Sequence, residues 1–439
     1  WNGLTSIHFY IREGYFGSAL SECEKRLIES NEPRLVVLRG LTLVLLERRS
    51  EGLRLLEGAR EGECALGALY ALRVAHARTT KADKESQRLV EAEIAKSQKE
   101  ASLEALLSAI EVLILSQSMN GVKALLDRAT SASGGTNGQV CNLMGWFEIQ
   151  SGGNQNTAQK MFEKAAGMGY PDGYLGRVAI LEKRRATPEM RIVAKELSTS
   201  NVRLIPAHIA SAKADMADRE WSSAAQTIAN AALIQEDSVY LHFLRTVHAI
   251  VYKGSEMEEA TNTLSAHFDK TEKANGHLAF SYALFFTSIA LKNGSVIKLA
   301  KKMLERALAV SPSTDEYSVL AFRLFVAIGD EKEALNRAKI LVKSPSDNPY
   351  ALLSMVICSL MSGNIRDAHS QLSFVKEAHA KIKKSPLFHF LDGICARYVS
   401  NGSFDAFLIS MKNAIEEQFA NVQGVPFGID GIFTLDVDF

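Results

Sequence analysis

The sequence predicts an all-α protein, built as a superhelical solenoid of stacked helical hairpins. Three observations point to this class: a 34-residue period recurs along the chain, apolar residues within it follow helical spacing, and no stretch sustains the alternation of a β-strand. The length of 439 residues also suits a solenoid, because each unit packs only on its neighbours and the chain need not divide into several compact cores.

Alanines and turn glycines carry the period. Ala300, Ala334 and Ala368 follow one another at intervals of 34 residues, and Gly329 and Gly363 repeat the same interval. This is the tetratricopeptide period, in which each unit is a helix, a turn and a second helix. A small side chain at the alanine position lets the second helix approach the first closely, so a large residue there should split the hairpin.

Apolar spacing defines the two helices of a unit. Within residues 317–328 and 334–342, apolar residues recur with the period of a helix, which predicts a first and a second helix. Proline lacks an amide donor and disfavours helix in the residue before it. Pro312, Pro345 and Pro386 are therefore expected where second helices stop.

The same pattern can be followed toward the N-terminus, and about a dozen hairpins fit residues 1–420. Residues 76–100 interrupt it, because they are rich in charged and small polar residues, which predicts an exposed connection or a charged helix. Residues 421–439 are expected to begin a connection to further repeats. The expected structural positions of the repeat are small or aromatic residues at turns and in second helices: Gly14, Ala19, Gly40, Ala158, Phe162, Gly176, Ala225, Ala260, Ala300, Ala307, Gly329, Ala334, Gly363 and Ala368.

Composition argues against several classes of partner. Lysine plus arginine equals aspartate plus glutamate at 50 each, so no overall field attracts nucleic acid or an anionic membrane, although local charged patches remain open. Neither nucleic acid nor direct insertion into a membrane is expected. The longest apolar runs, such as residues 41–46, are too short to span a bilayer. The five cysteines lie far apart and form no CxxC pair, which predicts reduced core thiols of an intracellular protein.

No motif for catalysis, a cofactor or a metal stands out. His242 and His248 are six residues apart, off a shared helix face, and no histidine combines with cysteines at the spacing of metal ligands. The glycine-rich residues 134–138 lack the lysine and hydroxyl residue of a phosphate-binding loop. Glu258 and Glu259 are expected on a solvated face. The sequence therefore predicts no catalytic, cofactor-binding or metal-binding residues.

Two surface features bear on partners. Basic clusters at residues 183–185, 301–302 and 381–384 have acidic neighbours and are interpreted as helix-end charges or solvated faces. Adjacent aromatic residues such as Phe285 and Phe286 cannot both point into a core, so one of each pair is a candidate contact to a partner.

Motifs at both ends of the chain resemble a known family. Tyr-Ile-Arg-Glu-Gly-Tyr-Phe at residues 10–16 resembles the opening of the large tetratricopeptide-repeat subunit of intraflagellar transport complex A, the tetratricopeptide repeat protein 21 family. Residues 422–429 and 435–439 resemble later elements of that family, although Val437 replaces a proline. Between these ends, Gly145-Trp146, Arg219-Glu-Trp221 and the alanine hairpins occur in the family's order, while Pro188 is expected to interrupt a second helix.

The resemblance implies a function and a location. Members of this family are non-catalytic scaffold subunits of trains that move along cilia and flagella, associated with retrograde transport and entry of membrane cargo. It implies the N-terminal portion of a longer solenoid, located in the cytoplasm, cilium or flagellum and basal body. The implied partners are the other complex A subunits, which are WD40 and tetratricopeptide proteins, together with ciliary cargo.

Two alternatives remain open at this point. Tetratricopeptide receptors for the peptide tails of chaperones, or of another multi-subunit assembly, use Lys, Arg and Asn on successive first helices to clamp a carboxylate. The first helices here are mostly apolar and aromatic, which disfavours that hypothesis. The second alternative, an enzyme with a repeat extension, requires a catalytic domain outside this chain.

Overall fold

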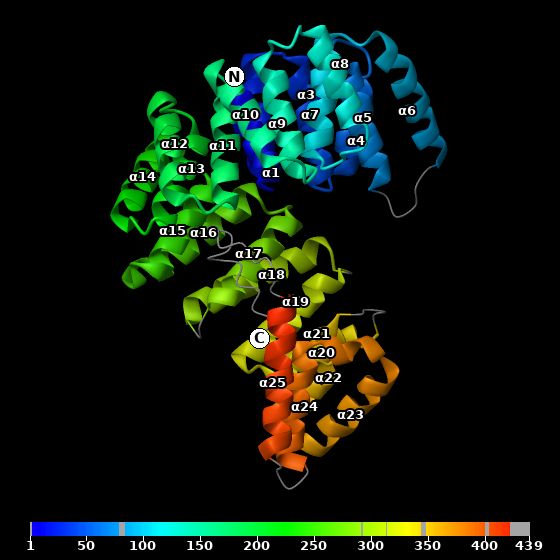
Figure 1. Cartoon of the computed structure of the whole chain (residues 1–439), viewed down its shortest axis with the longest axis vertical. Helices are drawn as coiled ribbons and strands as arrows, with labels where there is room; N and C mark the ends of the chain where they lie inside the picture. Colours follow the sequence, from blue (N-terminus) through cyan, green and yellow to red (C-terminus); the bar gives the residue numbers. More distant parts are fainter. Residues whose placement is uncertain are drawn as a thin grey trace. The chain divides into compact units, whose positions relative to one another are not determined.

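The computed structural model describes residues 2–78, 84–290, 293–312, 314–343, 348–399 and 404–421. Within them the chain is made of α-helices and short 3-10 helices without a strand, so the predicted all-α class is confirmed (Figure 1). None of the helices in this part is long and apolar enough to cross a membrane. The chain divides into two compact units, residues 1–275 and 276–439.

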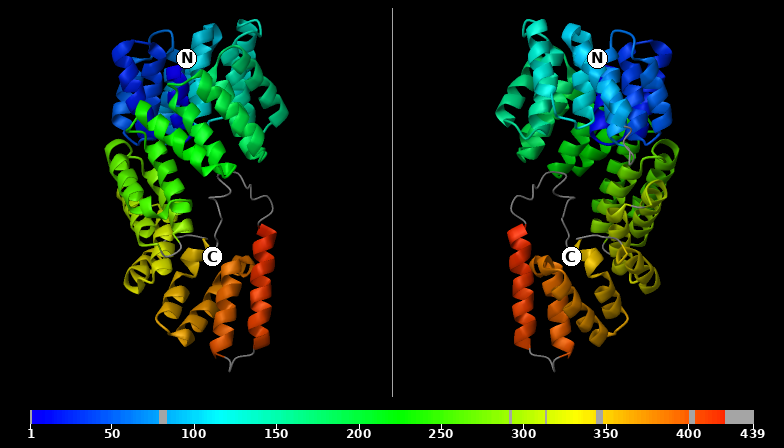
Figure 2. Two further views of the ribbon diagram at one scale, coloured as in Figure 1. Left: turned by 90° about the vertical axis from the view of Figure 1, so that its left-hand side faces the viewer. Right: turned by 90° about the vertical axis from the view of Figure 1, so that its right-hand side faces the viewer.

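The described part of the N-terminal unit contains sixteen α-helices that pair in chain order into hairpins. Their stacking can be followed from blue to green in Figure 2. These are α1 (Asn2–Arg12), α2 (Phe16–Glu29), α3 (Pro33–Leu45), α4 (Arg49–Gly58), α5 (Ala65–Ala77), α6 (Lys84–Ser97), α7 (Leu103–Leu115), α8 (Val122–Ala132), α9 (Gly138–Gln150), α10 (Gln155–Gly167), α11 (Pro171–Lys183), α12 (Thr187–Ser200), α13 (Ile205–Ala217), α14 (Trp221–Ile234), α15 (Val239–Val251) and α16 (Met257–Thr271). Short 3-10 helices η1 (Gln98–Glu100) and η2 (Gly254–Glu256) connect some of them.

The C-terminal unit continues the pairing. Its helices are α17 (Gly276–Ile289), α18 (Gly294–Val310), α19 (Asp315–Ile328), α20 (Glu331–Leu341), α21 (Pro349–Leu352), α22 (Ser354–Met361), α23 (Ile365–Ala378), η3 (Ala380–Lys384), α24 (Pro386–Val399) and α25 (Phe404–Asn421). The short α21 and α22 follow one another directly and together take the place of one first helix. Residues 422–439, expected to begin a connection, lie outside the described residues.

The charged segment forms a helix where the structure describes it. Within residues 76–100, α6 and η1 cover most of the chain, and residues 79–83 lie outside the described part. Val90 and Ile94 of α6 are buried against the preceding hairpin partner α5, while most of the other α6 residues are exposed. Two apolar residues one helical turn apart are therefore enough to dock this helix.

Most of the expected repeat alanines are buried where two helices meet. In the described helices, 2% or less of the residue surface is exposed at Ala19, Ala158, Ala260, Ala300, Ala307, Ala334 and Ala368. Ala225 differs from these alanines, because it is only half-buried and its neighbour Ala224 is the fully buried alanine of α14. One residue rotates a side chain by about 100° around a helix, and packing against α13 selects the face.

Glycines serve two different purposes in these hairpins. Gly14, Gly329 and Gly363 adopt φ values of +79°, +75° and +75°, a left-handed conformation that ends a first helix and that other residues adopt only with strain. Gly40 and Gly176 instead allow close approach. A Cβ atom at Gly40 would lie 2.6 Å from the Leu56 side chain, so α3 and α4 could not pack as they do.

Two expectations about proline are wrong. Pro386 begins α24, and Pro188 lies in the first turn of α12 without interrupting that helix. The first turn needs no intrahelical amide donor, and proline's fixed φ is already helical, so these prolines start helices. Pro312 does follow the end of α18, and Pro345 lies outside the described residues.

Candidate functional site

The first helix of the N-terminal unit lies inside that unit. Besides its hairpin partner α2, α1 packs against α7, α11 and α13 (Figure 1). Its residues from Ile7 to Ile11 are all buried, including His8. A helix buried on every side must satisfy its polar side chains within the protein. The polar side chains inside this unit are consequently the first candidates for a functional site.

Aromatic residues attach α1 to α15, which lies far along the chain. The Phe9 ring stacks on Tyr240 with centroids 5.8 Å apart, and the Tyr15 ring stacks on the same tyrosine at 4.4 Å. The Tyr240 hydroxyl donates a hydrogen bond of 2.9 Å to Oε2 of Glu13. Stacked aromatic rings of this kind bury large areas and favour one orientation, so α1 has a defined position against α15.

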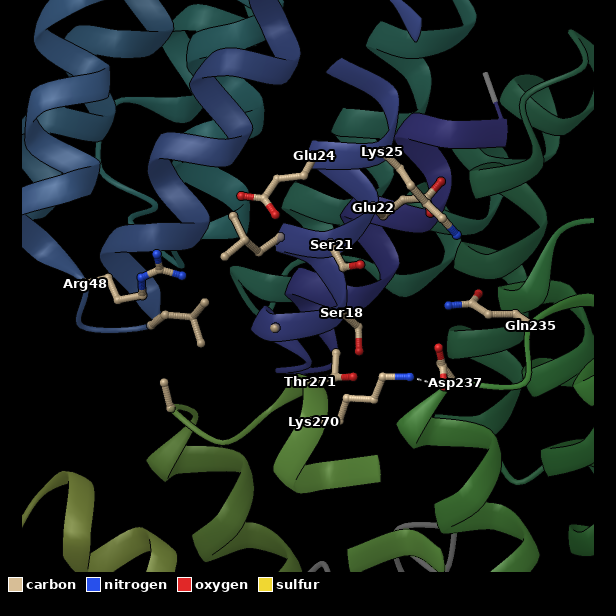
Figure 3. Close-up of a pocket in the computed structure, with 14 residues that line it drawn as sticks. Ser18, Ser21, Glu22, Glu24, Lys25, Arg48, Gln235, Asp237, Lys270 and Thr271 are labelled. Carbon is tan, nitrogen blue, oxygen red and sulfur yellow. Dashed lines mark hydrogen bonds and ion pairs between the residues drawn. The ribbon is translucent and has the colours of Figure 1, made fainter. Parts of the chain in front are cut away.

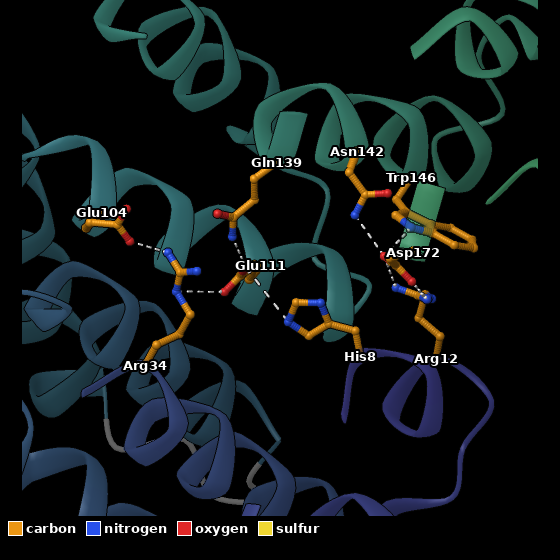
Figure 4. A network of polar contacts seen from close by, with 9 residues as sticks. All are labelled: His8, Arg12, Arg34, Glu104, Glu111, Gln139, Asn142, Trp146 and Asp172. Carbon is orange, nitrogen blue, oxygen red and sulfur yellow. Dashed lines mark hydrogen bonds and ion pairs between the residues drawn. The ribbon is translucent and has the colours of Figure 1, made fainter. Parts of the chain in front are cut away.

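Asp172 is the centre of a buried polar cluster (Figure 4). Both guanidinium ends of Arg12 donate to its carboxylate, with Nη1 lying 3.1 Å from Oδ2. Asn142 Nδ2 and Trp146 Nε1 each donate to Oδ2 over 2.8 Å. The Arg12 guanidinium also lies over the Trp146 ring, 3.8 Å from its centroid. A helix-to-helix contact between α1 and α11 is thus made by a charged pair with its hydrogen bonds satisfied.

The charge state of Asp172 follows from these partners. Burial by itself would raise the pKa of the Asp172 carboxyl, but the Arg12 charge and hydrogen bonds, with a smaller contribution from Asn142, hold it below its usual value. The group is therefore a carboxylate at neutral pH. Its strongest neighbours all donate to it, so it is held as an acceptor and is poorly placed to act as a general base.

A second cluster surrounds Glu111 of α7, which is 1% exposed (Figure 4). Gln139 Nε2 donates to its Oε1 over 2.6 Å, and Arg34 Nε lies 3.5 Å from Oε2. His8 Nε2 is 3.8 Å from Oε1. Burial, together with the charges of Arg12 and Arg34, lowers the pKa of His8 against the opposing effect of Glu111 and Asp172, so this imidazole is neutral at pH 7.

These clusters link helices without forming a reactive site. No cysteine belongs to either of them, and the five cysteines of the chain are buried free thiols. No group of three His, Cys, Asp or Glu residues within the described ranges could hold a metal ion. The first cluster fixes α1 against α9 and α11, and the second joins α3 and α9 to α7, at the cost of desolvating two carboxylates.

The unit closes on itself at a seam between α2 and α16. The Glu272 carboxylate, just after α16, accepts hydrogen bonds from the backbone amides of Gly17 and Ser18 at 2.8 and 2.7 Å, and from the Ser18 hydroxyl at 2.7 Å. Asn275 Nδ2 donates both to this carboxylate and to the Gly14 carbonyl. Glu272 thereby supplies the N-terminal cap that α2 lacks in its own sequence.

A cavity of about 330 Å³ adjoins this seam (Figure 3). Side chains of both signs line it, among them Lys25, Arg48 and Glu24, and Lys270 Nζ is already bonded to Asp237 at 2.8 Å. A cavity with mixed and internally paired charges selects no class of ligand by its electrostatics. We therefore assign no small-molecule site to it.

The aromatic pairs divide between the core and the surface. Phe286 is fully buried and Phe285 is partly exposed, and Phe388 is buried while 44% of Phe390 is exposed. In the adjacent pair, one ring is therefore in the core and the other is not, and the role of the second ring as a partner contact stays a prediction. Asp172, Glu111 and Glu272 were not singled out from the sequence, because an acidic residue in a helical repeat gives no signal of burial.

Comparison with known proteins identifies a family. Two models of one family match this chain: the tetratricopeptide repeat protein 21 N-terminal ARM repeat over residues 7–225 and the second ARM domain over residues 259–439. The tetratricopeptide repeat protein 21 homologues of Caenorhabditis briggsae and Caenorhabditis elegans are 34% and 33% identical over the whole chain. Human tetratricopeptide repeat protein 21B is 25% identical over 99% of it.

The matches span all of this sequence but only part of the relatives. The chain covers 33% of the Caenorhabditis briggsae and human proteins and 34% of the Caenorhabditis elegans protein. Its family and its fold are those of helical repeat scaffolds. With two models covering residues 7–225 and 259–439, the chain belongs to the tetratricopeptide repeat protein 21 family.

Proposed function

We propose that this chain is part of a non-catalytic scaffold subunit of intraflagellar transport complex A, which mediates protein contacts in ciliary or flagellar trains. Membership of the tetratricopeptide repeat protein 21 family is the observation that carries the proposal, because the family resemblance implies this complex. The proposed roles are retrograde transport and entry of ciliary membrane cargo. The proposed location is the cytoplasm, the cilium or flagellum and the basal body.

The interior of the N-terminal unit favours the scaffold function over the alternative function of a peptide receptor. A peptide receptor needs an open concave surface, whereas here α1 occupies the inside of the unit and is bonded to α11 through Arg12 and Asp172. Partners of this unit would then contact its outer helices and its edges. The proposed partners are other complex A subunits and cargo, without nucleic acid and without insertion into a membrane.

Purification of the tagged full-length parent from ciliated or flagellated cells tests the proposal, with co-purifying proteins identified by mass spectrometry. We expect the other complex A subunits in stoichiometric amounts. The same tag on an unrelated tetratricopeptide co-chaperone is the control for proteins that bind repeats in general. Recovery of chaperones or of an unrelated assembly in place of complex A would contradict the proposal and favour the peptide-receptor alternative.

A further inference from the structure

Positively charged residues recur at one position on three successive second helices of the C-terminal unit. Lys298 of α18, Lys332 of α20 and Arg366 of α23 follow one another at intervals of 34 residues, each two residues before the buried alanine of its helix. All three are exposed, and none of their side chains forms a hydrogen bond or an ion pair with another residue that the structure describes. These three residues form a cation row on the outer side of the hairpins.

The hairpin itself does not require a cation at this position. Two residues before four buried alanines of the N-terminal unit, the chain has residues that are not basic: Gly17, Asn156, Ser222 and Glu258. Lys332 and Arg366 also lie in the first turn of their helices, where the positive end of the helix dipole disfavours a positive charge. Neither packing nor the helix dipole accounts for the cation row, whereas acidic groups of a partner would be attracted to it.

The solvent-facing side of α20 is basic and apolar. Lys332, Asn336, Lys339 and Ile340 are all exposed and follow helical spacing, so they form one stripe along the helix, away from the buried Ala334. The two acidic residues that flank Lys332 in the sequence point about 100° to either side of it around the helix. A partner that contacts this stripe therefore meets cations and an apolar side chain.

A row of exposed apolar residues lies beside the cation row. Ile340 and Phe374 are also 34 residues apart, and each comes eight residues after the cation of its helix. Half of Ile340 and 71% of Phe374 is exposed, although both types of side chain are usually buried. Eight residues correspond to about 12 Å along a helix and about 80° around it, so the two rows run side by side across α20 and α23. We call Ile340 and Phe374 the apolar row.

We propose that the cation row and the apolar row together bind an amphipathic helix of a partner protein. This helix lies across α20 and α23, with acidic side chains against Lys332 and Arg366 and apolar side chains against Ile340 and Phe374. A helix with its side chains is about 10 to 12 Å across, which matches the separation of the two rows. The surface belongs to second helices and faces away from the first helices. The inference rests on the proposed scaffold role, to which it adds one surface and one class of partner.

Fluorescence anisotropy with the whole 439-residue chain tests this surface. The probe is a fluorescein-labelled helical peptide with leucine on one face and glutamate beside it, and the control ligand has the same composition in shuffled order. The charge-reversal variant is K332E/R366E. Its matched control is K383E/K384E, which reverses two exposed lysines on η3 of the same unit.

The apolar row is tested with F374S. Its matched control is Y398S, because Tyr398 on α24 is an aromatic residue of similar exposure, 68% against 71% for Phe374. All of these substitutions are at exposed positions, and circular dichroism verifies that each variant remains folded.

We expect K332E/R366E to weaken binding of the amphipathic peptide about tenfold or more and F374S to weaken it about fivefold, while each control changes it less than about twofold. Higher salt should weaken binding to the unchanged chain, because the charged pairs are exposed. Equal losses in a test variant and its control would overturn the proposal. Absent binding, or equal binding of the shuffled peptide, would overturn it as well.

Photo-crosslinking in the full-length parent tests the surface with its natural partner. A photoreactive phenylalanine analogue in place of Phe374 should crosslink to a helix that has one acidic and one apolar side, identified by mass spectrometry. The crosslink should disappear in K332E/R366E, and the same analogue in place of Tyr398 should not form it. Crosslinks from position 374 to lipid, to a second copy of the chain or to a later part of the same chain would overturn the proposal.

The two proposals can fail separately. An absent crosslink with complex A still co-purifying would remove only this surface. A crosslink to an acidic amphipathic helix of another assembly, without complex A, would keep the surface and remove the proposed function.

Discussion

At the scale of single residues, the smallest side chains decide how closely helices pack. Phe162 of α10 is fully buried, and its ring lies where two glycines of neighbouring helices approach. A Cβ atom would lie 2.6 Å from this ring at Gly145 of α9 and 2.3 Å at Gly176 of α11. The aromatic residue and both glycines thus pack together across three helices. This packing requires each of the three residues to keep its present size.

Gly176→Ala should destabilise the N-terminal unit by about 1 to 3 kcal/mol, because the added methyl group would collide with the buried ring. Gly167→Ala is the matched control, since nothing lies within 4 Å of a Cβ at this last residue of α10. There, alanine should be neutral or stabilise by up to about 1 kcal/mol. Thermal unfolding followed by circular dichroism measures both, and an unchanged Tm for the Gly176 variant would refute the packing argument.

At the scale of elements, α1 differs from the other first helices in what surrounds it. Most other first helices contact only the hairpins beside them, whereas α1 also contacts α7, α11 and α13. Its buried polar contacts determine its rotation and depth. A buried ion pair is weak evidence of net stability, because desolvation of both charges offsets their attraction. The pair of Arg12 and Asp172 is therefore better understood as selecting one placement of α1.

Removing only one charge of this pair should strongly lower the stability of the N-terminal unit. Arg12→Met should destabilise the N-terminal unit by about 3 to 5 kcal/mol, because the Asp172 carboxylate would stay buried without its cation. Asp172→Asn should also destabilise the unit, because it leaves the Arg12 charge buried without its partner. The double variant should lose less stability than the sum of the two single losses. Urea unfolding of the four proteins gives the coupling free energy. Additive effects would show that the two charges do not act as a pair.

Arg48→Met provides the comparison for Arg12. Arg48 pairs with Glu51 on the surface, where 43% and 49% of the two side chains are exposed. Removing such a solvent-exposed pair should change stability far less than removing Arg12 does. A loss at Arg48 equal to that at Arg12 would show that arginine truncation itself, and not burial of the partner charge, causes the effect.

At the scale of the whole molecule, the N-terminal unit is held closed by a contact between its second and sixteenth helices. The Glu272 carboxylate caps the first turn of α2, and the backbone there is tightly packed: a Cβ at Gly17 would lie 2.0 Å from the Thr271 carbonyl oxygen. Nearest-neighbour stacking alone would leave the ends of a solenoid independent. Here Glu272, Asn275 and Tyr240 all bond to residues of the first hairpin, so the unit should open as a cooperative whole.

Glu272→Gln should loosen this closure. The glutamine amide would place an NH₂ group against the amides of Gly17 and Ser18, leaving buried donors unpaired at a cost of about 1 to 3 kcal/mol. Hydrogen exchange at these two amides should accelerate, and the Tm should fall. Glu258→Gln, an exposed change on α16, should stay within about 0.5 kcal/mol. Unchanged exchange at the start of α2 would contradict the role of Glu272.

The sequence by itself determined the helical class, the hairpin unit and most of its buried alanines. Those features depend on short-range spacing, because a helix repeats its faces within a few residues and a close contact between adjacent helices needs a small side chain such as Ala334. The interruption at residues 76–100 could also be located, since composition shows where apolar residues become sparse. Ala225 marks the limit of this approach. Ala224 and Ala225 are the same type of residue, and only their different positions around α14 decide which of them is buried.

Only the tertiary structure decided that α1 lies inside its unit and which polar residues hold it. The Arg12–Asp172 and Gly17–Glu272 contacts join residues 160 and 255 positions apart. Such pairings arise from small rotations that accumulate from hairpin to hairpin, and no local pattern encodes their sum. Packing likewise decides that Ile340 stays exposed, because its neighbour Leu341 occupies the inward position on α20.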